Sequence, residues 1–304
     1  MEPRGATEIQ HELLEKHVDK DLLSKFQICT SIPGKIPLDP KKINILWQKN
    51  SWDQPNLQSF FRNKERHDEY DWYVFNSHWN YEKFRYFFQI PEDKSIVIKN
   101  GASHFPKRKI HKQGDPIRII HHCTPWRGLN VLLRAWELLR PANCELHVFS
   151  STKIYGQQFD LASGNQYDYL YEKCNSLKGV VYRGMTDNAV LRGELSTFDI
   201  LAYPSTFEET SCISVIDALS AGLKVVCSNI GALPETTEGW AEMYSFVQDN
   251  ERHAQIFASK LSEVIAKYKR GDYKQELQNQ VNVYGPKWSW NQREKEWLKY
   301  LDSL

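Results

Sequence analysis

Two carboxylates mark the two ends of a segment that opens a predicted helix. Glu209 and Asp217 are separated by seven residues, and Gly222, a residue typical of helix ends, closes the run. An ionised carboxylate only accepts hydrogen bonds, so it pairs well with sugar hydroxyls, which donate them. We expect Glu209 to face a sugar ring and Asp217, about two turns into the helix, to face a ribose.

The start of the same helix is suited to binding an anion. Thr210 or Ser211 is expected to be its N-cap. The first N–H groups of a helix have no partner within it, and together with the positive end of the helix dipole they bind anions without a side-chain cation. We therefore predict that a diphosphate binds at Thr210, Ser211, Cys212 and Ile213. For the motif alone, the alternative is a solvated helix start.

This stretch resembles the signature of retaining glycosyltransferases of the GT-B fold (glycosyltransferase family 4-like, glycosyl transferases group 1). In that family, two acidic residues separated by seven others precede a run of small residues that ends in glycine. Glu209 and Asp217 match this pair, with Asp217 where the family usually has Glu, which shortens its reach to the ribose. The resemblance implies that Glu209 orients the donor sugar.

A second segment resembles the same family. Its members have a basic residue, four others, then Lys-Gly and an apolar helix, and the two basic side chains neutralise the donor diphosphate. His122 and Arg127 stand at these positions, with Gly128 next. Arg127 can contact two phosphate oxygens and always carries charge, whereas His122 is cationic at neutral pH only if the phosphate raises its pKa. The alternative for His122 is a structural histidine at a strand end.

Weaker matches occur in the order that the family has. Gly184 and Met185 follow a strand-like segment where the family's backbone approaches the nucleobase, which glycine permits. The run Gly231 to Glu235 is similar to the family's Gly and Pro-Glu loop. Gly5 resembles a glycine of the family's first loop, although the strand that usually precedes it is missing. The segment Trp47 to Asn50 contains no histidine where many relatives have one near the donor sugar.

Composition points to a globular chain of two domains. Its 304 residues are 41% apolar, and 39 Lys and Arg balance 38 Asp and Glu, so no overall charge recruits nucleic acid or an anionic membrane. Six scattered cysteines indicate reduced thiols and a cytoplasmic location. No signal peptide and no apolar run of about 18 residues is present, so we expect no transmembrane segment, with peripheral membrane contact still allowed.

Apolar runs alternate with helical patterns, which favours parallel sheets covered by helices on both faces. We predict an α/β protein with the GT-B architecture, two Rossmann-like domains facing across a cleft, the N-terminal one abbreviated. The predicted strands are 26–30, 43–47, 71–75, 95–98, 117–122, 146–149, 180–182, 200–203 and 225–228. The predicted helices are 7–17, 56–65, 79–88, 129–139 and 288–304, with a further helix between its cap at Thr210 or Ser211 and its end at Gly222.

The predicted boundaries follow a basic linker, Pro106 to Pro116, that interrupts the pattern. Residues 1–112 form an acceptor-side domain, residues 113–285 a domain that binds the nucleotide-sugar donor, and residues 286–304 a C-terminal helix that packs back toward the N-terminal domain. The linker's basic cluster is expected to be solvated rather than bound to phosphate.

The resemblance implies transfer of a sugar, with retained configuration, from a nucleotide-diphosphate donor to a glycan, lipid-linked or small-molecule acceptor. Glu209, Arg127 and His122 are the predicted catalytic residues, and preorganised donors around the departing diphosphate are expected to contribute most. Neither a metal nor a cofactor is expected, the nucleotide sugar being a co-substrate. The alternatives are a GT-B epimerase or phosphorylase, or a nucleotide-sugar-binding module that has lost transfer.

Overall fold

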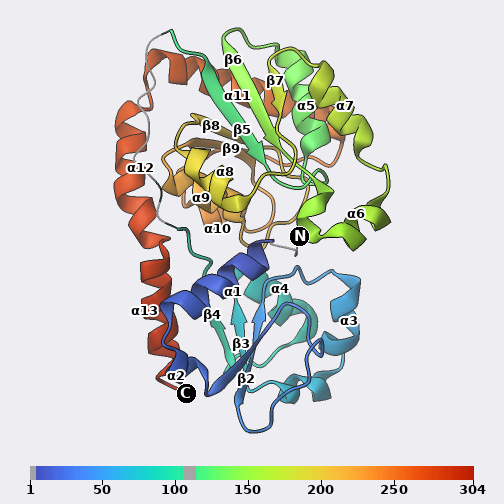
Figure 1. Cartoon of the computed structure of the whole chain (residues 1–304), viewed down its shortest axis with the longest axis vertical. Helices are drawn as coiled ribbons and strands as arrows, with labels where there is room; N and C mark the ends of the chain where they lie inside the picture. Colours follow the sequence, from blue (N-terminus) through green and yellow to red (C-terminus); the bar gives the residue numbers. More distant parts are fainter. Residues whose placement is uncertain (1–4, 104, 106–113) are drawn as a thin grey trace.

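The chain folds into two lobes, each built on its own parallel sheet (Figure 1). The computed structural model describes residues 5–103, 105 and 114–304. The parallel sheets confirm the predicted α/β class. Most of the predicted linker, residues 106–113, lies outside the described residues, and so does its basic cluster.

The first lobe has a four-stranded sheet in the order β1-β2-β3-β4. Its strands are β1 (Phe26–Thr30), β2 (Ile43–Gln48), β3 (Trp72–Phe75) and β4 (Ser95–Val97). Its helices are α1 (Ala6–His17), α2 (Lys20–Leu23), α3 (Pro55–Phe61), the 3-10 helix η1 (Lys64–Glu69) and α4 (His78–Phe88). Side chains of a strand alternate between faces. In β2, Ile45 and Trp47 therefore join one core and Leu46 joins the other.

The second lobe has a six-stranded sheet in the order β10-β9-β8-β5-β6-β7. Its strands are β5 (Ile117–His122), β6 (Cys144–Phe149), β7 (Val180–Tyr182), β8 (Ile200–Tyr203), β9 (Lys224–Ser228) and β10 (Glu242–Tyr244). The strand order reverses between β5 and β8, as in doubly wound Rossmann sheets, and ligands of such sheets bind outside the carboxyl ends of the strands at this reversal.

Helices cover both faces of the second sheet. They are α5 (Leu129–Leu139), the 3-10 helix η2 (Thr152–Tyr155), α6 (Gln157–Ser163), α7 (Asp168–Ser176), α8 (Asn188–Leu195), α9 (Ile213–Ser220), α10 (Leu233–Thr237), α11 (Asn250–Arg270) and α12 (Lys274–Lys287). On α5, Leu132, Leu133 and Trp136 are buried in one core, and α9 packs in the other. The two cores hold the β5 and β8 strand ends in place.

The C-terminal helix α13 (Trp290–Leu301) crosses to the first lobe. It begins two residues later than predicted, because Pro286 lies near the end of α12 and the Ser289 side chain caps α13 by accepting from the Gln292 N–H. Figure 1 shows α12 beside the second lobe and α13 beside the first. The Trp297 ring meets the Trp47 ring of β2 edge to face, with centroids 4.9 Å apart.

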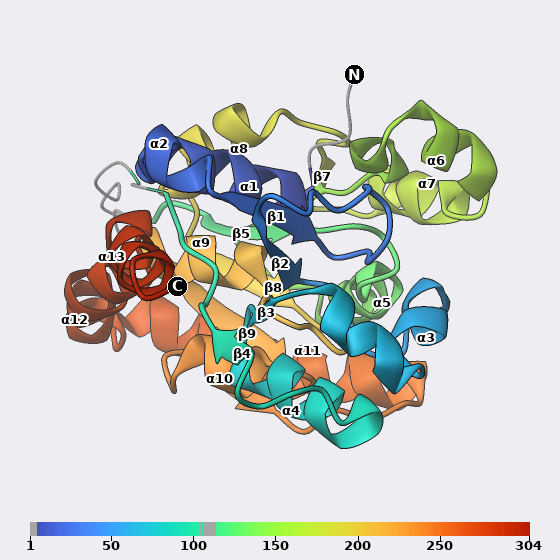
Figure 2. The ribbon, with the colours of Figure 1, turned by 90° about the horizontal axis from the view of Figure 1, so that it is seen from below.

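A carboxylate of α10 joins the two lobes. The Glu235 side chain accepts from the first N–H groups of α4, those of His78 at 3.0 Å and Trp79 at 2.9 Å, and pairs with Lys99 at 3.2 Å. Figure 2 shows α4 and α10 side by side. Burial raises the pKa of Glu235, but the two amide hydrogen bonds and Lys99 together lower it below its ordinary value. The charge at this contact is therefore stable at neutral pH and complements the α4 dipole.

Three buried histidines predict a loss of stability in mild acid. Burial lowers the pKa of His121 and of His253 to about 4, and that of His122 to about 3. An unfolded histidine titrates near pH 6.5, so below that pH the unfolded chain binds more protons than the native chain. The stabilisation is complete above about pH 6.5 and falls as the pH drops. We expect a loss on the order of 1–2 kcal/mol per histidine at pH 5.

Urea unfolding at pH 7.5, 6.5, 5.5 and 5.0 measures this loss. His253→Gln removes one titrating group away from the cleft, so the variant should show a shallower decline than the wild type. Equal unfolding free energies of the wild type at pH 7.5 and 5.0 would contradict the prediction.

Candidate active site

A cleft of about 730 Å³ opens between the lobes at the carboxyl ends of both sheets. Its volume lies within the range typical of small-molecule sites, and it adjoins the reversal between β5 and β8. Residues predicted from the sequence as catalytic or donor-binding all line it. They are Gly5, His122, Arg127, Gly184, Met185, Glu209, Thr210, Ser211, Cys212, Ile213 and Asp217. The fold therefore brings them together, although the role of each is still a prediction.

The loop after β8 holds Glu209 in a buried position. Glu209 is 4% exposed, and its side chain accepts a hydrogen bond from the Tyr203 hydroxyl at 2.6 Å. Its carbonyl accepts from the Ala232 N–H at 2.7 Å. Tyr203, at the end of β8, thus orients the Glu209 carboxylate. The loop after β9 holds the backbone of Glu209 in place.

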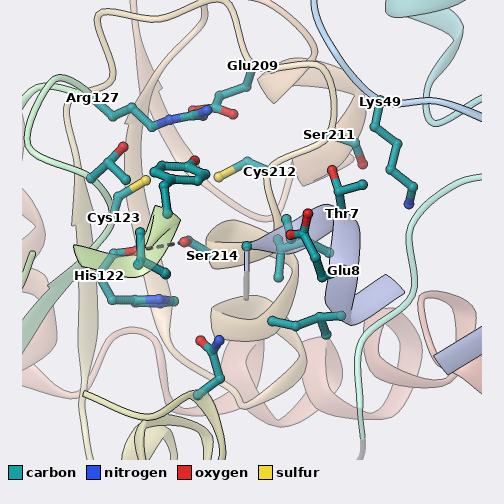
Figure 3. Close-up of a pocket in the computed structure, with 18 of the residues that line it drawn as sticks. Thr7, Glu8, Lys49, His122, Cys123, Arg127, Glu209, Ser211, Cys212 and Ser214 are labelled. Atoms are coloured by element: carbon teal, nitrogen blue, oxygen red, sulfur yellow. Dashed lines mark hydrogen bonds and ion pairs between the residues drawn. The ribbon is translucent and has the colours of Figure 1, made fainter. Parts of the chain in front are cut away.

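Arg127 forms an ion pair with Glu209. Its guanidinium donates to the carboxylate (Figure 3). The guanidinium also lies over the Phe207 ring, 4.4 Å from the ring centroid. Burial lowers the pKa of Arg127, but the Glu209 carboxylate outweighs this effect and raises it well above its ordinary value. The sequence predicts that Arg127 and Glu209 each contact the donor. In the structure, the two side chains are also paired with each other.

The predicted cap of α9 is wrong, and the reason lies in the first lobe. Cys212 is the N-cap, and no side chain caps the helix. The Thr210 hydroxyl instead donates to the Lys49 carbonyl at 2.8 Å and accepts from the Asn76 amide at 3.0 Å. Within the described residues, the N–H groups of 210–213 have no acceptor. They are available to an anion in the cleft.

His122 is neutral at neutral pH unless a ligand raises its pKa, so its predicted role as the second cation still depends on the phosphate. Burial, followed by the neighbouring His121 and Arg192, lowers its pKa to about 3. The Ser214 hydroxyl donates to the His122 carbonyl at 2.7 Å, tying the end of β5 to the first turn of α9. The neutral ring remains able to form a hydrogen bond in the cleft.

Asp217 is paired with an arginine of α8. Its Oδ2 accepts from Arg192 Nε at 2.9 Å, and its side chain is almost fully buried. Burial raises the pKa of Asp217, while Arg192 opposes this shift. Its Oδ1 has no partner among the described residues. One carboxylate oxygen is therefore structural, and the other is free for the predicted ribose hydroxyl.

Several other polar atoms of the cleft are buried without a partner. In the described part of the chain they are Ser31 Oγ, His122 Nε2, Thr124 Oγ1, Ser150 Oγ, Ser211 Oγ and Asp217 Oδ1. An unsatisfied buried polar group typically costs about 1–3 kcal/mol, so such groups are rare unless a ligand or water satisfies them. The six groups of the cleft offer hydrogen-bonding partners to a ligand rich in hydroxyl or other polar groups.

The two predicted glycines of the cleft have different geometries. Gly184 has a φ of +60°, a conformation that favours glycine, and is followed by the half-exposed Met185. Gly5 is extended and is the N-cap of α1, whose first turn also faces the cleft. The ends of two helices, α1 and α9, thus line the same cavity.

Sequence reasoning missed the contribution of the first lobe. Glu8, Lys49, Asn76 and Asn100 line the cleft and were not predicted to act there. Lys49 and Asn76 directly follow β2 and β3. The signal that could have found them is their position, because the carboxyl ends of parallel strands meet at one edge of a sheet.

Two further observations concern membranes and metals. Among residues 5–103, 105 and 114–304, none of the helices combines the length and the apolar character needed to cross a bilayer. Within the same residues, no three His, Cys, Asp or Glu side chains gather in a way that could hold a metal ion. All six cysteines are free thiols.

Comparison with solved structures shows the architecture of the whole chain. The Anabaena protein Alr3699/HepE in complex with UDP and glucose superposes with a TM-score of 0.67 at 13% identity, covering 87% of this chain and 72% of that one. A glycosyltransferase from Rickettsia africae gives 0.64 at 14%, covering 100% and 83%. Sucrose-phosphate synthase from Thermosynechococcus elongatus gives 0.65 at 13%, covering 98% and 78%. At these identities the likeness establishes the fold.

The sequence itself matches one family model. Residues 118–267 match the model described as Glycosyl transferases group 1, which spans most of the second lobe and includes Arg127, Glu209 and Asp217. No curated protein sequence matches the chain significantly. The chain is therefore a glycosyltransferase: residues 118–267 belong to the glycosyl transferases group 1 family, and the two lobes have the GT-B fold.

Proposed function

We propose that the enzyme transfers a sugar from a uridine-diphosphate donor to a hydroxyl acceptor with retention of the anomeric configuration. The observation that carries the proposal is the combination in one cleft of unpaired N–H groups before α9, a buried guanidinium and unsatisfied polar atoms. The first two favour a diphosphate and the third favours a sugar. Two structural relatives were solved with UDP and a sugar, one with glucose and one with GlcNAc, which supports the choice of base.

In the proposed mechanism, the diphosphate lies against Arg127 and the N–H groups of 210–213, which stabilise the negative charge that develops on it. The bond between the anomeric carbon and the phosphate oxygen breaks, and the acceptor oxygen bonds to the same face of that carbon. The acceptor's proton passes to the departing phosphate oxygen, so no protein nucleophile is required. Glu209 accepts a hydrogen bond from a hydroxyl of the sugar and fixes its position.

Further parts of the proposal concern the surroundings of the reaction. Arg127 and the amide groups supply positive potential, and we propose that transfer needs no divalent cation and no cofactor besides the donor. The free thiols and the near-neutral net charge support action in the cytoplasm. The acceptor is a carbohydrate or another hydroxyl compound.

Nucleotide binding tests the proposal directly. UDP at 100 times its dissociation constant is expected to stabilise the protein by about 2.7 kcal/mol, which raises the melting temperature by several degrees. UMP should stabilise less, because it lacks one of the two phosphates that face Arg127 and α9. GDP and ADP serve as base controls. If no nucleoside diphosphate raises the melting temperature, the proposal is wrong.

Donor hydrolysis separates an enzyme from a binding module. With UDP-glucose and no acceptor, we expect slow release of glucose. NMR should show that the glucose first released has the same α configuration as in the donor. Release of the β anomer would contradict the retaining mechanism, and tight binding without any release would favour a module that has lost transfer.

A further inference from the structure

Lys49 contributes a buried amine to the cleft. It directly follows β2, lines the cleft and is 8% exposed. Its Nζ lies 3.3 Å from Asn100 Oδ1 and 3.3 Å from the centroid of the Trp47 ring. Among the described residues, no carboxylate forms an ion pair with it. Lysine is almost never buried unless it is paired, so the position calls for an explanation outside the chain.

Contacts with the second lobe hold Lys49 in place. Its carbonyl accepts from the Thr210 hydroxyl, and its partner Asn100 donates to the Ser211 carbonyl at 3.1 Å. Figure 3 shows Lys49 on the side of the cleft where Glu8 and Ser211 lie, away from Arg127. The amine is thus fixed beside the segment that enters α9, at a different place from the guanidinium that faces the predicted diphosphate.

The charge of Lys49 is compensated only in part, by the face of the Trp47 ring, whose centroid lies 3.3 Å from Nζ, and by the Glu8 carboxylate. Burial lowers the pKa of Lys49 well below its ordinary value, and Glu8 raises it without forming an ion pair. The nearby start of α9 contributes a positive dipole end, which disfavours a second positive charge. A bound anion would reverse this balance, because an opposite charge at short range favours the charged form of an amine.

These observations identify the kind of ligand group. A sugar hydroxyl needs only an amide or hydroxyl partner, which Ser211 Oγ, unpaired within the described chain, already offers, whereas a buried ammonium specifically suits an anion. The diphosphate is served by Arg127 and the free N–H groups on the other side. We propose, resting on the function above, that Lys49 selects for an acidic sugar by binding its carboxylate, whether the sugar belongs to the donor or to the acceptor.

Isothermal titration with paired probes tests the selection and its source. In the donor arm, UDP-glucuronic acid is compared with UDP-glucose. In the acceptor arm, methyl glucuronide is compared with methyl glucoside on the UDP-saturated protein. The wild type should bind the acidic member of at least one pair about tenfold more tightly, since breaking a buried charge pair costs at least that much. The arm that shows the preference assigns the carboxylate to donor or acceptor.

Two variants keep the test specific. Lys49→Met retains the length of the side chain without its charge and should abolish the preference while UDP still binds. Lys35→Met removes an exposed lysine that lines the same cleft and should leave the preference intact. Equal binding of both members of each pair, or a preference that survives Lys49→Met, overturns this inference but leaves the proposed function standing. A protein that binds no nucleotide overturns the inference together with the proposed function.

Discussion

Replacing Glu209 by glutamine is expected to lower turnover by roughly 100- to 1,000-fold while the protein stays folded and still binds UDP. Glutamine keeps the shape of the side chain that meets Tyr203 and Arg127. It loses the charge that orients a sugar hydroxyl and that balances the guanidinium. Because these interactions matter most when the glycosidic bond breaks, the rate constant for turnover should fall more than the affinity for the nucleotide.

Alanine substitutions at this pair are expected to report on stability as well as on activity. Arg127→Ala leaves the Glu209 carboxylate, whose side chain is 6% exposed, without its cation. Breaking one half of a buried pair typically costs roughly 3–5 kcal/mol. Arg127→Ala is therefore expected to lose stability as well as turnover. The double variant Arg127→Met with Glu209→Gln removes both charges and should recover most of the stability without recovering turnover.

Steady-state kinetics and urea unfolding on the same preparations separate the two effects. The double variant is the matched control, since its stability shows whether a lost rate reflects a lost fold. Turnover of Glu209→Gln within about threefold of the wild type would remove Glu209 from the mechanism, because a group that contributes to the transition state cannot be neutralised at so small a cost.

The strands of the second lobe were predictable because their signals are local. The bounds of β5, β7, β8 and α5 agree with the sequence prediction, since each is a continuous apolar or helix-periodic run. The edge strand β10 was missed, because Glu242-Met243-Tyr244 lacks the β-branched residues that mark the equally short edge strand β7, Val180–Tyr182. Helix α11 was also missed, although Asp249 at its N-cap and Gly271 at its end are ordinary helix signals. The first miss reflects weak local information, and the second does not.

The features of the candidate site also divide into those that the sequence could predict and those that it could not. The residues of the second lobe could be predicted from fixed spacings within short motifs. The pairing of Arg127 with Glu209 joins positions 82 residues apart, and the hydrogen bond from Asn100 to Ser211 joins positions 111 residues apart. Such contacts depend on how the lobes dock and on how loops meet, so no local pattern in one sequence reveals them. The correction at the cap of α9 has this cause, since the Thr210 hydroxyl bonds to Lys49 and Asn76 of the first lobe.

The second prediction with a large effect on turnover concerns Gly231, which packs against the backbone of Glu209. Gly231→Ala is expected to lower turnover by roughly 100-fold or more, because the added Cβ would lie 2.5 Å from the Glu209 nitrogen and 2.7 Å from its oxygen. Both are backbone atoms, so the Glu209 loop itself has to move. Gly231 also has a φ of +62°, where alanine is strained by about 1 kcal/mol.

Gly239→Ala separates displacement from strain. Gly239 has a φ of +84° and nothing within 4 Å of an added Cβ, so alanine there carries the same backbone strain without a clash. Both variants should lose about 1 kcal/mol of unfolding free energy from strain, while only Gly231→Ala should lose turnover. The Ala232 N–H bonds the Glu209 carbonyl at 2.7 Å, which requires the two loops to touch at this point. If the two variants turn over equally, the close approach at Gly231 does not position Glu209, and the carboxylate must take its orientation from Tyr203 and Arg127 alone.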